Sequence, residues 1–210
     1  MATQASRRNT MTLFTAAEDM YCHHVRIVLA EKGIAADWVQ VNAGLIPEEV
    51  YEVNPYGSLP TLIDRDLALY QSDIILEYLD ERFPHPPLLP VYPVARAQAR
   101  QMLYRIRRDW FSLVTRIEAN EAGAAEARRD LRESLLSIAP LFDEQPFFMS
   151  DEFSLLDCYL AALLWRLPKL GIELQGPAAK SVKSYMVRVF ERDGFQQSLT
   201  EKERRLRADW

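Results

Sequence analysis

The hydrophobic positions of the first eighty residues alternate between two spacings. Short apolar runs predict four strands, at residues 12–15, 38–41, 59–63 and 67–70. Apolar residues three and four positions apart predict helices that end before Gly33, over residues 47–53, and from Ser72, as N-cap, through residue 79. The predicted order is therefore β-α-β-α-β-β-α. This alternation indicates an α/β domain in which a parallel βαβ unit is followed by an antiparallel hairpin.

The pattern changes at residue 83, where four prolines fall within eight residues. Proline fixes φ and lacks the backbone N–H, so this stretch predicts a stiff, extended linker. Beyond it the spacing predicts an all-α domain with three apolar stripes, through Leu103, Ile106, Trp110, Leu113 and Ile117, through Leu131, Leu135, Ile138 and Phe142, and through Val182, Tyr185, Met186, Val189 and Phe190. Ser154 and Asp157 predict a capping box for a helix that is apolar on nearly every face. We expect the charged residues 199–210 to face solvent.

Length and composition fit two soluble domains. The chain has 210 residues, 49% of them hydrophobic, and the predicted domains span residues 11–83 and 93–210, with the linker at 84–92. Two cysteines exclude a disulfide scaffold, and the longest apolar run, at residues 158–165, is too short to span a membrane. We therefore expect a cytoplasmic protein whose first ten residues are a disordered lead. Residues 11–90 carry nine more acidic than basic side chains, which disfavours nucleic acid as a direct partner.

One candidate reactive group lies near the start of the first predicted helix. The helix dipole would stabilise a thiolate at Cys22, which is the basis of a reactive-thiol hypothesis. The alternative, a half-buried structural residue, is favoured because the sequence positions no base beside this thiol. A dithiol motif is excluded because residue 25 is valine. The adjacent His23 and His24 point to different helix faces, so no metal site is expected.

Two further residues could hold a peptide ligand. A cis peptide before Pro60 would expose the preceding backbone to an extended peptide, whereas base rates favour the trans form. The free N–H groups behind Ser72 could bind a carboxylate, but capping of its own helix explains this serine by itself. The sequence leaves both alternatives open.

Two segments are candidate partner surfaces, one rich in arginine and the other rich in proline. Five arginines lie on one predicted helix, at positions 96, 100, 105, 107 and 108. A solvated face is favoured over DNA binding, because no aromatic stacking platform accompanies the arginines. The proline segment would lose little entropy on binding, so it is either a docking surface or a spacer. Its candidate partner-binding residues are Pro84, His85, Pro86 and Tyr92.

Several motifs resemble known families. The resemblance to the glutathione transferase fold rests on VRIVLAEKG at 25–33, NP at 54–55, LPTL at 59–62 and QS at 71–72. Within that superfamily the chain is more similar to the stringent starvation protein A family. This second resemblance rests on YLDERFPHPPL at 78–88, PVYPVAR at 90–96 and SDEFSL at 150–155. It covers nearly the whole chain, and its proline-histidine block is specific.

This resemblance implies an N-terminal thioredoxin-like domain and a C-terminal helical bundle. Family members are RNA polymerase-associated transcription regulators of stationary phase and starvation, and they form dimers. By resemblance, Pro84, His85 and Pro86 dock on the polymerase holoenzyme near its sigma factor, and DNA is engaged only indirectly. A homodimer is the expected assembly, and a paralogous heterodimer is the alternative.

The resemblance also implies that transferase activity is lost. Alignment on residues 25–27 places Tyr21, and not Cys22, at the usual cysteine position of the related transferases. The resemblance implies a vestigial glutathione-type pocket at Tyr21, Cys22, Leu59, Pro60, Gln71 and Ser72, of which the last three match the transferase positions that hold the glutathione peptide. No catalytic residue, metal or cofactor is therefore expected. The alternative function is a glutathione-dependent thiol transferase that uses Cys22.

Overall fold

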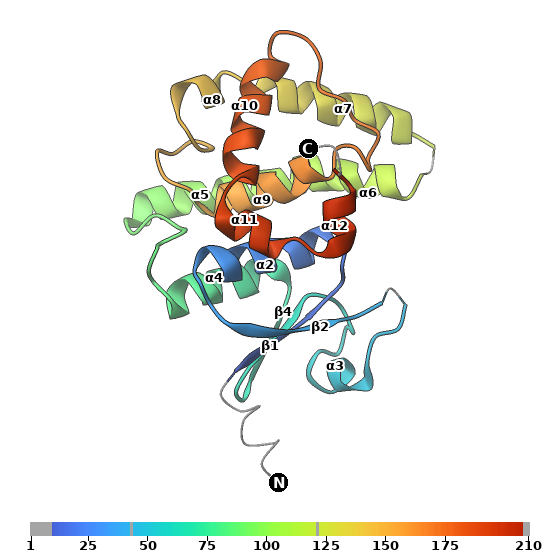
Figure 1. Cartoon of the computed structure of the whole chain (residues 1–210), viewed down its shortest axis with the longest axis vertical. Coiled ribbons are helices and arrows are strands. Elements are labelled where there is room, and N and C mark those ends of the chain that lie inside the picture. Colours follow the sequence, from blue (N-terminus) through green and yellow to red (C-terminus); the bar gives the residue numbers. More distant parts are fainter. Residues whose placement is uncertain (1–9, 43, 121, 208–210) are drawn as a thin grey trace. The chain divides into compact units, whose positions relative to one another are not determined.

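The chain forms two compact units in the computed structural model, which describes residues 10–42, 44–120 and 122–207 (Figure 1). The first unit consists of the described residues up to Pro86 together with Asp193–Arg205. The second consists of the described residues between Pro87 and Arg192 and of residues 206–207. The predicted domain 93–210 is thus divided, because residues 193–205 pack with the first unit. The predicted disordered lead lies, apart from Thr10, outside the described residues.

A mixed four-stranded sheet forms the centre of the first unit. Its strands are β1 (Met11–Thr15), β2 (Ala36–Gln40), β3 (Thr61–Asp64) and β4 (Leu67–Tyr70), in the order β2-β1-β3-β4. β1 pairs with β2 in parallel, with Leu13 opposite Trp38. β3 is antiparallel to both β1 and β4. The predicted parallel unit and the hairpin that follows it are both confirmed.

Helices of the first unit come from both ends of the sequence. They are α2 (Met20–Glu31), α3 (Glu48–Val53), α4 (Ser72–Arg82), α11 (Asp193–Ser198) and α12 (Glu201–Arg205). The Asp19 side chain accepts a hydrogen bond from the Cys22 backbone N–H at the start of α2, at 2.7 Å. Gly33 ends that helix with φ of 61°, as expected for a glycine stop. α2 and α4 lie together on one side of the sheet, and α11 packs against α2 (Figure 1).

Ser72 does not cap α4, contrary to the prediction. It is the first residue of the helix, and the capping position belongs to Gln71, whose φ is 71°. No side chain caps this end of α4. The prediction relied on residue type, whereas the cap position is set by the backbone turn that leaves β4.

The second unit is helical. Its elements are α5 (Pro93–Arg105), a π-helical segment η1 (Ile106–Phe111), α6 (Ser112–Glu118), α7 (Ala124–Ser137), α8 (Leu141–Glu144), α9 (Leu155–Trp165) and α10 (Ala179–Phe190). Every residue of α9 is buried, and Ser154 with Asp157 forms the predicted capping box. No helix in the described part of the chain is long and apolar enough to cross a bilayer.

The first apolar stripe of this unit is shifted by the π-helical segment. A π turn accommodates one extra residue, so the positions after it rotate relative to an ideal α-helix. Leu113, predicted to be core, is only half-buried, whereas Val114 is 3% exposed. The regular spacing of three and four residues could not reveal this insertion.

Candidate functional site

The predicted pocket residues are brought to one end of the sheet. Thr61 of β3 pairs with Tyr70 of β4, so Pro60 and Gln71 lie just beyond the same rung of the hairpin. Phe14, near the end of β1, pairs with Thr61 as well. The loop that follows β1 leads directly into α2, which carries the remaining predicted pocket residues. The topology therefore gathers all of them at this end.

The predicted pocket residues at this end of the sheet differ in their exposure. The Leu59–Pro60 peptide is cis, with Pro60 buried and Leu59 half-buried. Ser72 is buried, and its hydroxyl lies 3.4 Å from a carboxylate oxygen of Asp73. Gln71 is exposed. Of the two alternatives at Pro60, the cis form is the one observed.

Cys22 is buried and lacks the properties of a reactive thiol. Its side chain is fully enclosed, and its sulfur accepts a hydrogen bond from the Ala16 backbone N–H at 3.3 Å. Burial, reinforced by the negative charge of Asp19, raises the pKa of Cys22 from 9.0 to about 12. The expected stabilisation of a thiolate by the helix dipole is therefore outweighed. The predicted half-buried position is also wrong, because the residue is completely inside.

Tyr21 is the half-buried neighbour of this thiol. Its ring meets that of His24 edge-on, with centroids 5.9 Å apart. Cys22 lies next to it in sequence but faces the interior, so the two adjacent residues have different environments. The group that the sequence places in the usual cysteine position is thus a phenol.

The proline segment provides the second candidate site. Pro84, His85 and Pro86 are all exposed at the end of the first unit. In the second unit, Tyr92 is 79% exposed and directly precedes α5. Large hydrophobic side chains are normally buried, so an exposed aromatic in a rigid segment is a feature of binding surfaces. The predicted partner-binding residues are therefore available to a partner.

A buried lysine holds the first part of this segment. The Lys32 ammonium donates to the carbonyl oxygens of Phe83 and Pro86, at 2.7 and 2.6 Å. It also lies 2.7 Å from a carboxylate oxygen of Asp80, and its side chain is fully buried. Sequence reasoning missed this residue, because a lysine after the last turn of a helix is expected to face that helix's own carbonyl end.

A second buried cation, Arg26 of α2, anchors the C-terminal segment of the first unit. Its Nη2 donates to both carboxylate oxygens of Glu203, each at 2.7 Å. Its remaining donors reach the Thr15 hydroxyl and the carbonyl oxygens of Ala16 and Ser198, at 2.6, 3.1 and 3.0 Å. All five N–H donors of the guanidinium are thereby used.

His23 joins the same cluster from α2. Its Nε2 lies 2.9 Å from the Ser198 hydroxyl, and its Nδ1 lies 3.6 Å from Glu203. Both His23 and Glu203 are fully buried. Within the described part of the chain, no group of three or more acidic, histidine or cysteine side chains could hold a metal ion.

The prediction that the charged end faces solvent is wrong at two residues. Glu203 is fully buried and accepts hydrogen bonds from the Thr200 backbone N–H and hydroxyl, at 3.0 and 2.9 Å. In the second unit, Arg207 donates to the carbonyl oxygens of Trp165 and Leu164, at 3.0 and 2.6 Å. Burial lowers the pKa of Arg207 to about 10. Charge count alone misleads here, because each group has a specific buried partner.

Arginines of the second unit form a largely solvated face, as favoured from the sequence. Arg105 lies 3.9 Å from Asp109, and both side chains are more than half exposed. Arg108 donates to the hydroxyl of Tyr104 at 3.3 Å. Arg96 instead donates to the Pro90 carbonyl oxygen at 2.8 Å, which ties α5 to the proline segment within this unit.

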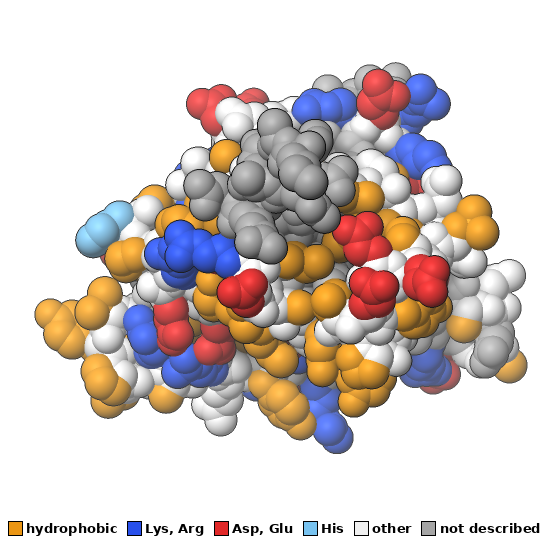
Figure 2. Space-filling model, turned by 90° about the horizontal axis from the view of Figure 1, so that it is seen from below, with side chains coloured by type: hydrophobic (Ala, Val, Ile, Leu, Met, Phe, Trp, Pro, Cys, Tyr) orange, Lys and Arg blue, Asp and Glu red, His pale blue; other side chains and the backbone are white. Residues whose placement is uncertain are grey.

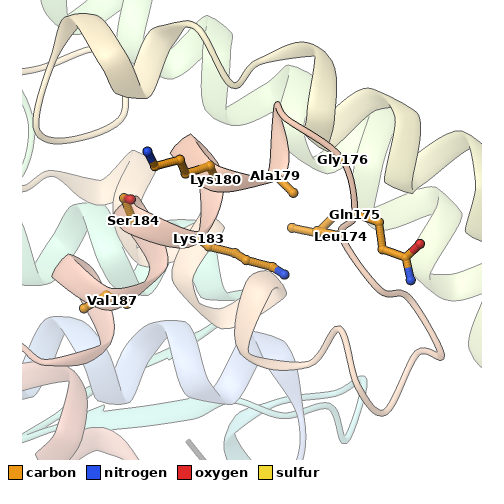
Figure 3. Close-up of a pocket in the computed structure, with 8 residues that line it drawn as sticks. All are labelled: Leu174, Gln175, Gly176, Ala179, Lys180, Lys183, Ser184 and Val187. Carbon is orange, nitrogen blue, oxygen red and sulfur yellow. The ribbon is translucent and has the colours of Figure 1, made fainter.

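An open hollow of about 570 Å³ lies on the second unit, and none of its lining residues is a candidate site residue from the sequence. Its lining includes Leu174, Ala179 and Val187. Lys183 extends towards Leu174, whereas Lys180 points away from it (Figure 3). Surface lysines around an open hollow do not by themselves define a ligand, so we assign it no role.

Comparisons with known proteins agree with this architecture. Family profiles described as the glutathione S-transferase N-terminal and C-terminal domains match residues 13–87 and 102–193. A protein of Pasteurella multocida (strain Pm70), described as a stringent starvation protein A homolog, is 54% identical over 200 residues. That match covers 95% of this chain and 94% of the relative. The chain belongs to the stringent starvation protein A family.

Further comparisons include another member of this family and a solved structure that shares only the fold. A stringent starvation protein A homolog of Coxiella burnetii (strain RSA 493 / Nine Mile phase I) is 50% identical over 202 residues, covering 96% of this chain and 97% of the relative. The tau class glutathione S-transferase from mango, Mangifera indica, matches with a TM-score of 0.80 at 24% identity, covering 94% and 95%. This last likeness shows the fold alone. The predicted family and glutathione transferase-like fold are both confirmed.

Proposed function

We propose that this protein is an RNA polymerase-associated regulator of transcription in starvation, which acts by binding and not by catalysis. The observation that carries the proposal is the exposure of the family's proline-histidine block. Pro84, His85 and Pro86 face solvent, and Tyr92 exposes 79% of its surface. Prolines and rigid aromatics lose little conformational entropy on binding, so these residues suit the docking of a protein.

The state of Cys22 supports a role without thiol catalysis. A catalytic thiol needs access to substrate and a lowered pKa. Cys22 has neither, because it is fully buried and its pKa is raised to about 12. The alternative of a thiol transferase that uses Cys22 thus has no support from the geometry.

The surface chemistry of the first unit is consistent with a basic protein partner. Acidic and hydrophobic side chains lie next to one another on the face shown in Figure 2, with basic side chains between them. On and around α3, Glu48, Glu49, Tyr51 and Tyr56 are exposed. Acidic groups favour encounter with a basic surface and oppose direct contact with DNA phosphates. The proposed docking near the sigma factor engages DNA only through the polymerase.

Replacement of the proline block tests this function. The triple variant Pro84→Ala, His85→Ala, Pro86→Ala should lose co-purification with RNA polymerase holoenzyme while keeping the wild-type circular dichroism spectrum. Pro55→Ala, an exposed proline of the same unit, is the matched control and should still co-purify. Tyr92→Ala should weaken capture more than Tyr104→Ala, because Tyr104 lies outside the proline segment although it is also exposed, at 59%. Undiminished capture by the triple variant would refute the docking proposal.

We also propose that the working form is a dimer. Light scattering on the purified protein should give twice the chain mass of 24.3 kDa. Mass spectrometry of the protein captured from cells distinguishes a homodimer from a pair with a paralogous subunit. A monomer at micromolar concentration would contradict the proposal.

A further inference from the structure

We propose that Lys32 is the positioning residue of the docking segment: its ammonium gathers the carbonyl oxygens of Phe83 and Pro86 so that Pro84 and His85 face outwards. The effect of Lys32 on partner binding rests on the proposed docking function, whereas the anchoring of the segment can be tested separately. All of the groups involved belong to the first unit.

The composition of the segment explains why a side-chain cation is needed. Proline has no backbone N–H, so in residues 84–87 only His85 has a backbone donor. Among the described residues, no backbone–backbone hydrogen bond involves residues 84–87. Such a segment can be held to its own unit chiefly through its carbonyl oxygens, which need donors from elsewhere.

The Lys32 ammonium meets this need completely. It has three N–H donors and three oxygen partners, the carbonyls of Phe83 and Pro86 and the carboxylate of Asp80, at 2.7, 2.6 and 2.7 Å. The two carbonyls are three residues apart and flank Pro84 and His85. Because both oxygens point at one buried cation, the intervening side chains are left on the solvent side, where both residues are exposed.

Asp80 has a different part in this arrangement. Its carboxylate is 5% exposed and lies in α4, outside the proline segment. There it balances the buried charge of Lys32. Loss of Lys32 alone would remove the ammonium that pairs with the largely buried Asp80 carboxylate, which destabilises a fold regardless of any positioning role. The experiment must therefore separate charge balance from carbonyl anchoring.

Two variants make this separation. Asp80→Asn keeps an oxygen acceptor for Lys32 and keeps both carbonyl bonds. The pair Lys32→Met with Asp80→Leu removes the anchor without leaving a buried charge. In this pair we expect the His85 backbone to become mobile, with its amide NMR order parameter falling from a rigid value of about 0.85 to below about 0.6. Capture of RNA polymerase holoenzyme should fall about tenfold or more, as loss of charged hydrogen bonds allows, while Asp80→Asn retains both properties.

The outcomes distinguish the inference from the function on which it rests. An unchanged His85 order parameter in the double variant overturns the anchoring. If polymerase capture falls in step with the melting temperature in both variants, and not only where the carbonyl bonds are lost, the positioning role is overturned. Lys32 then has a purely structural role. Failure of the wild-type protein to capture polymerase refutes the proposed function instead, and the His85 measurement still decides the anchoring.

Discussion

Removal of the Glu203 carboxylate tests the buried cluster that joins the end of the chain to α2. In Glu203→Ala, the Nη2 group of Arg26 loses both of its acceptors, and Thr200 loses the partner of its backbone N–H. The guanidinium stays fully buried with its charge uncompensated. Breaking a buried pair in this way costs about 3 to 5 kcal/mol of unfolding free energy. For a chain of this length the melting temperature should fall by roughly 10 °C.

The measurement is urea unfolding followed by far-ultraviolet circular dichroism, with Glu201→Ala as the matched control. Glu201 lies in the same helix and pairs with Arg205 at 4.0 Å, but its side chain is 91% exposed. Loss of such a pair should change the unfolding free energy by less than about 0.5 kcal/mol. The double variant Arg26→Met, Glu203→Leu should lose less than the sum of its single variants, because neither charge is left alone. A Glu203→Ala variant as stable as Glu201→Ala would refute this reasoning.

Two further predictions concern other buried groups. Asp157→Ala should lower the unfolding free energy by about 2 to 4 kcal/mol. The reason is that it removes the acceptor of the Phe148 and Ser154 backbone N–H groups and of the Tyr185 hydroxyl. Thermal unfolding measures the loss, and a value below about 1 kcal/mol would contradict the prediction. Cys22 should react with a thiol reagent at pH 8 only as the protein unfolds, and rapid labelling of the native state would show an accessible thiol. Because its folded pKa of about 12 exceeds the ordinary 9.0, the unfolded state releases the proton first. The unfolding free energy should therefore fall as pH rises above about 9, by up to about 1.4 kcal/mol per pH unit, and Cys22→Ala should lack this contribution.

Local sequence patterns predicted the features that depend on neighbouring residues. The strands follow from short apolar runs, the end of α2 from Gly33, and the start of α9 from Ser154 and Asp157. At the two helix ends the stabilising groups lie within a few residues, whereas the strands are recognised from their own apolar runs although their partner strands lie farther along the chain. The resemblance supplied the pocket residues, and the strand register brings their positions to one end of the sheet.

The missed features depend on partners that are far apart in sequence. Lys32 and Phe83 are separated by 51 positions, and Arg26 and Glu203 by 177. No periodicity links such residues, so the charged end looked like a solvated face. One local signal was present: Thr200 and Glu203 have the spacing of a capping box, which predicts an ordered helix start in place of a free tail.

Assignment of residues 193–205 to the first unit has a consequence for synthesis on the ribosome. The first unit is completed by residues 193–205, which are translated only after the intervening residues 87–192 of the second unit. At typical elongation rates, the interval between synthesis of Arg26 and synthesis of Glu203, 177 positions later, is roughly 10 to 35 s. During that interval the guanidinium remains hydrated, and the surface of α2 that α11 later covers stays open. A nascent chain stalled before residue 193 should accordingly be more sensitive to protease in its first unit than the released protein.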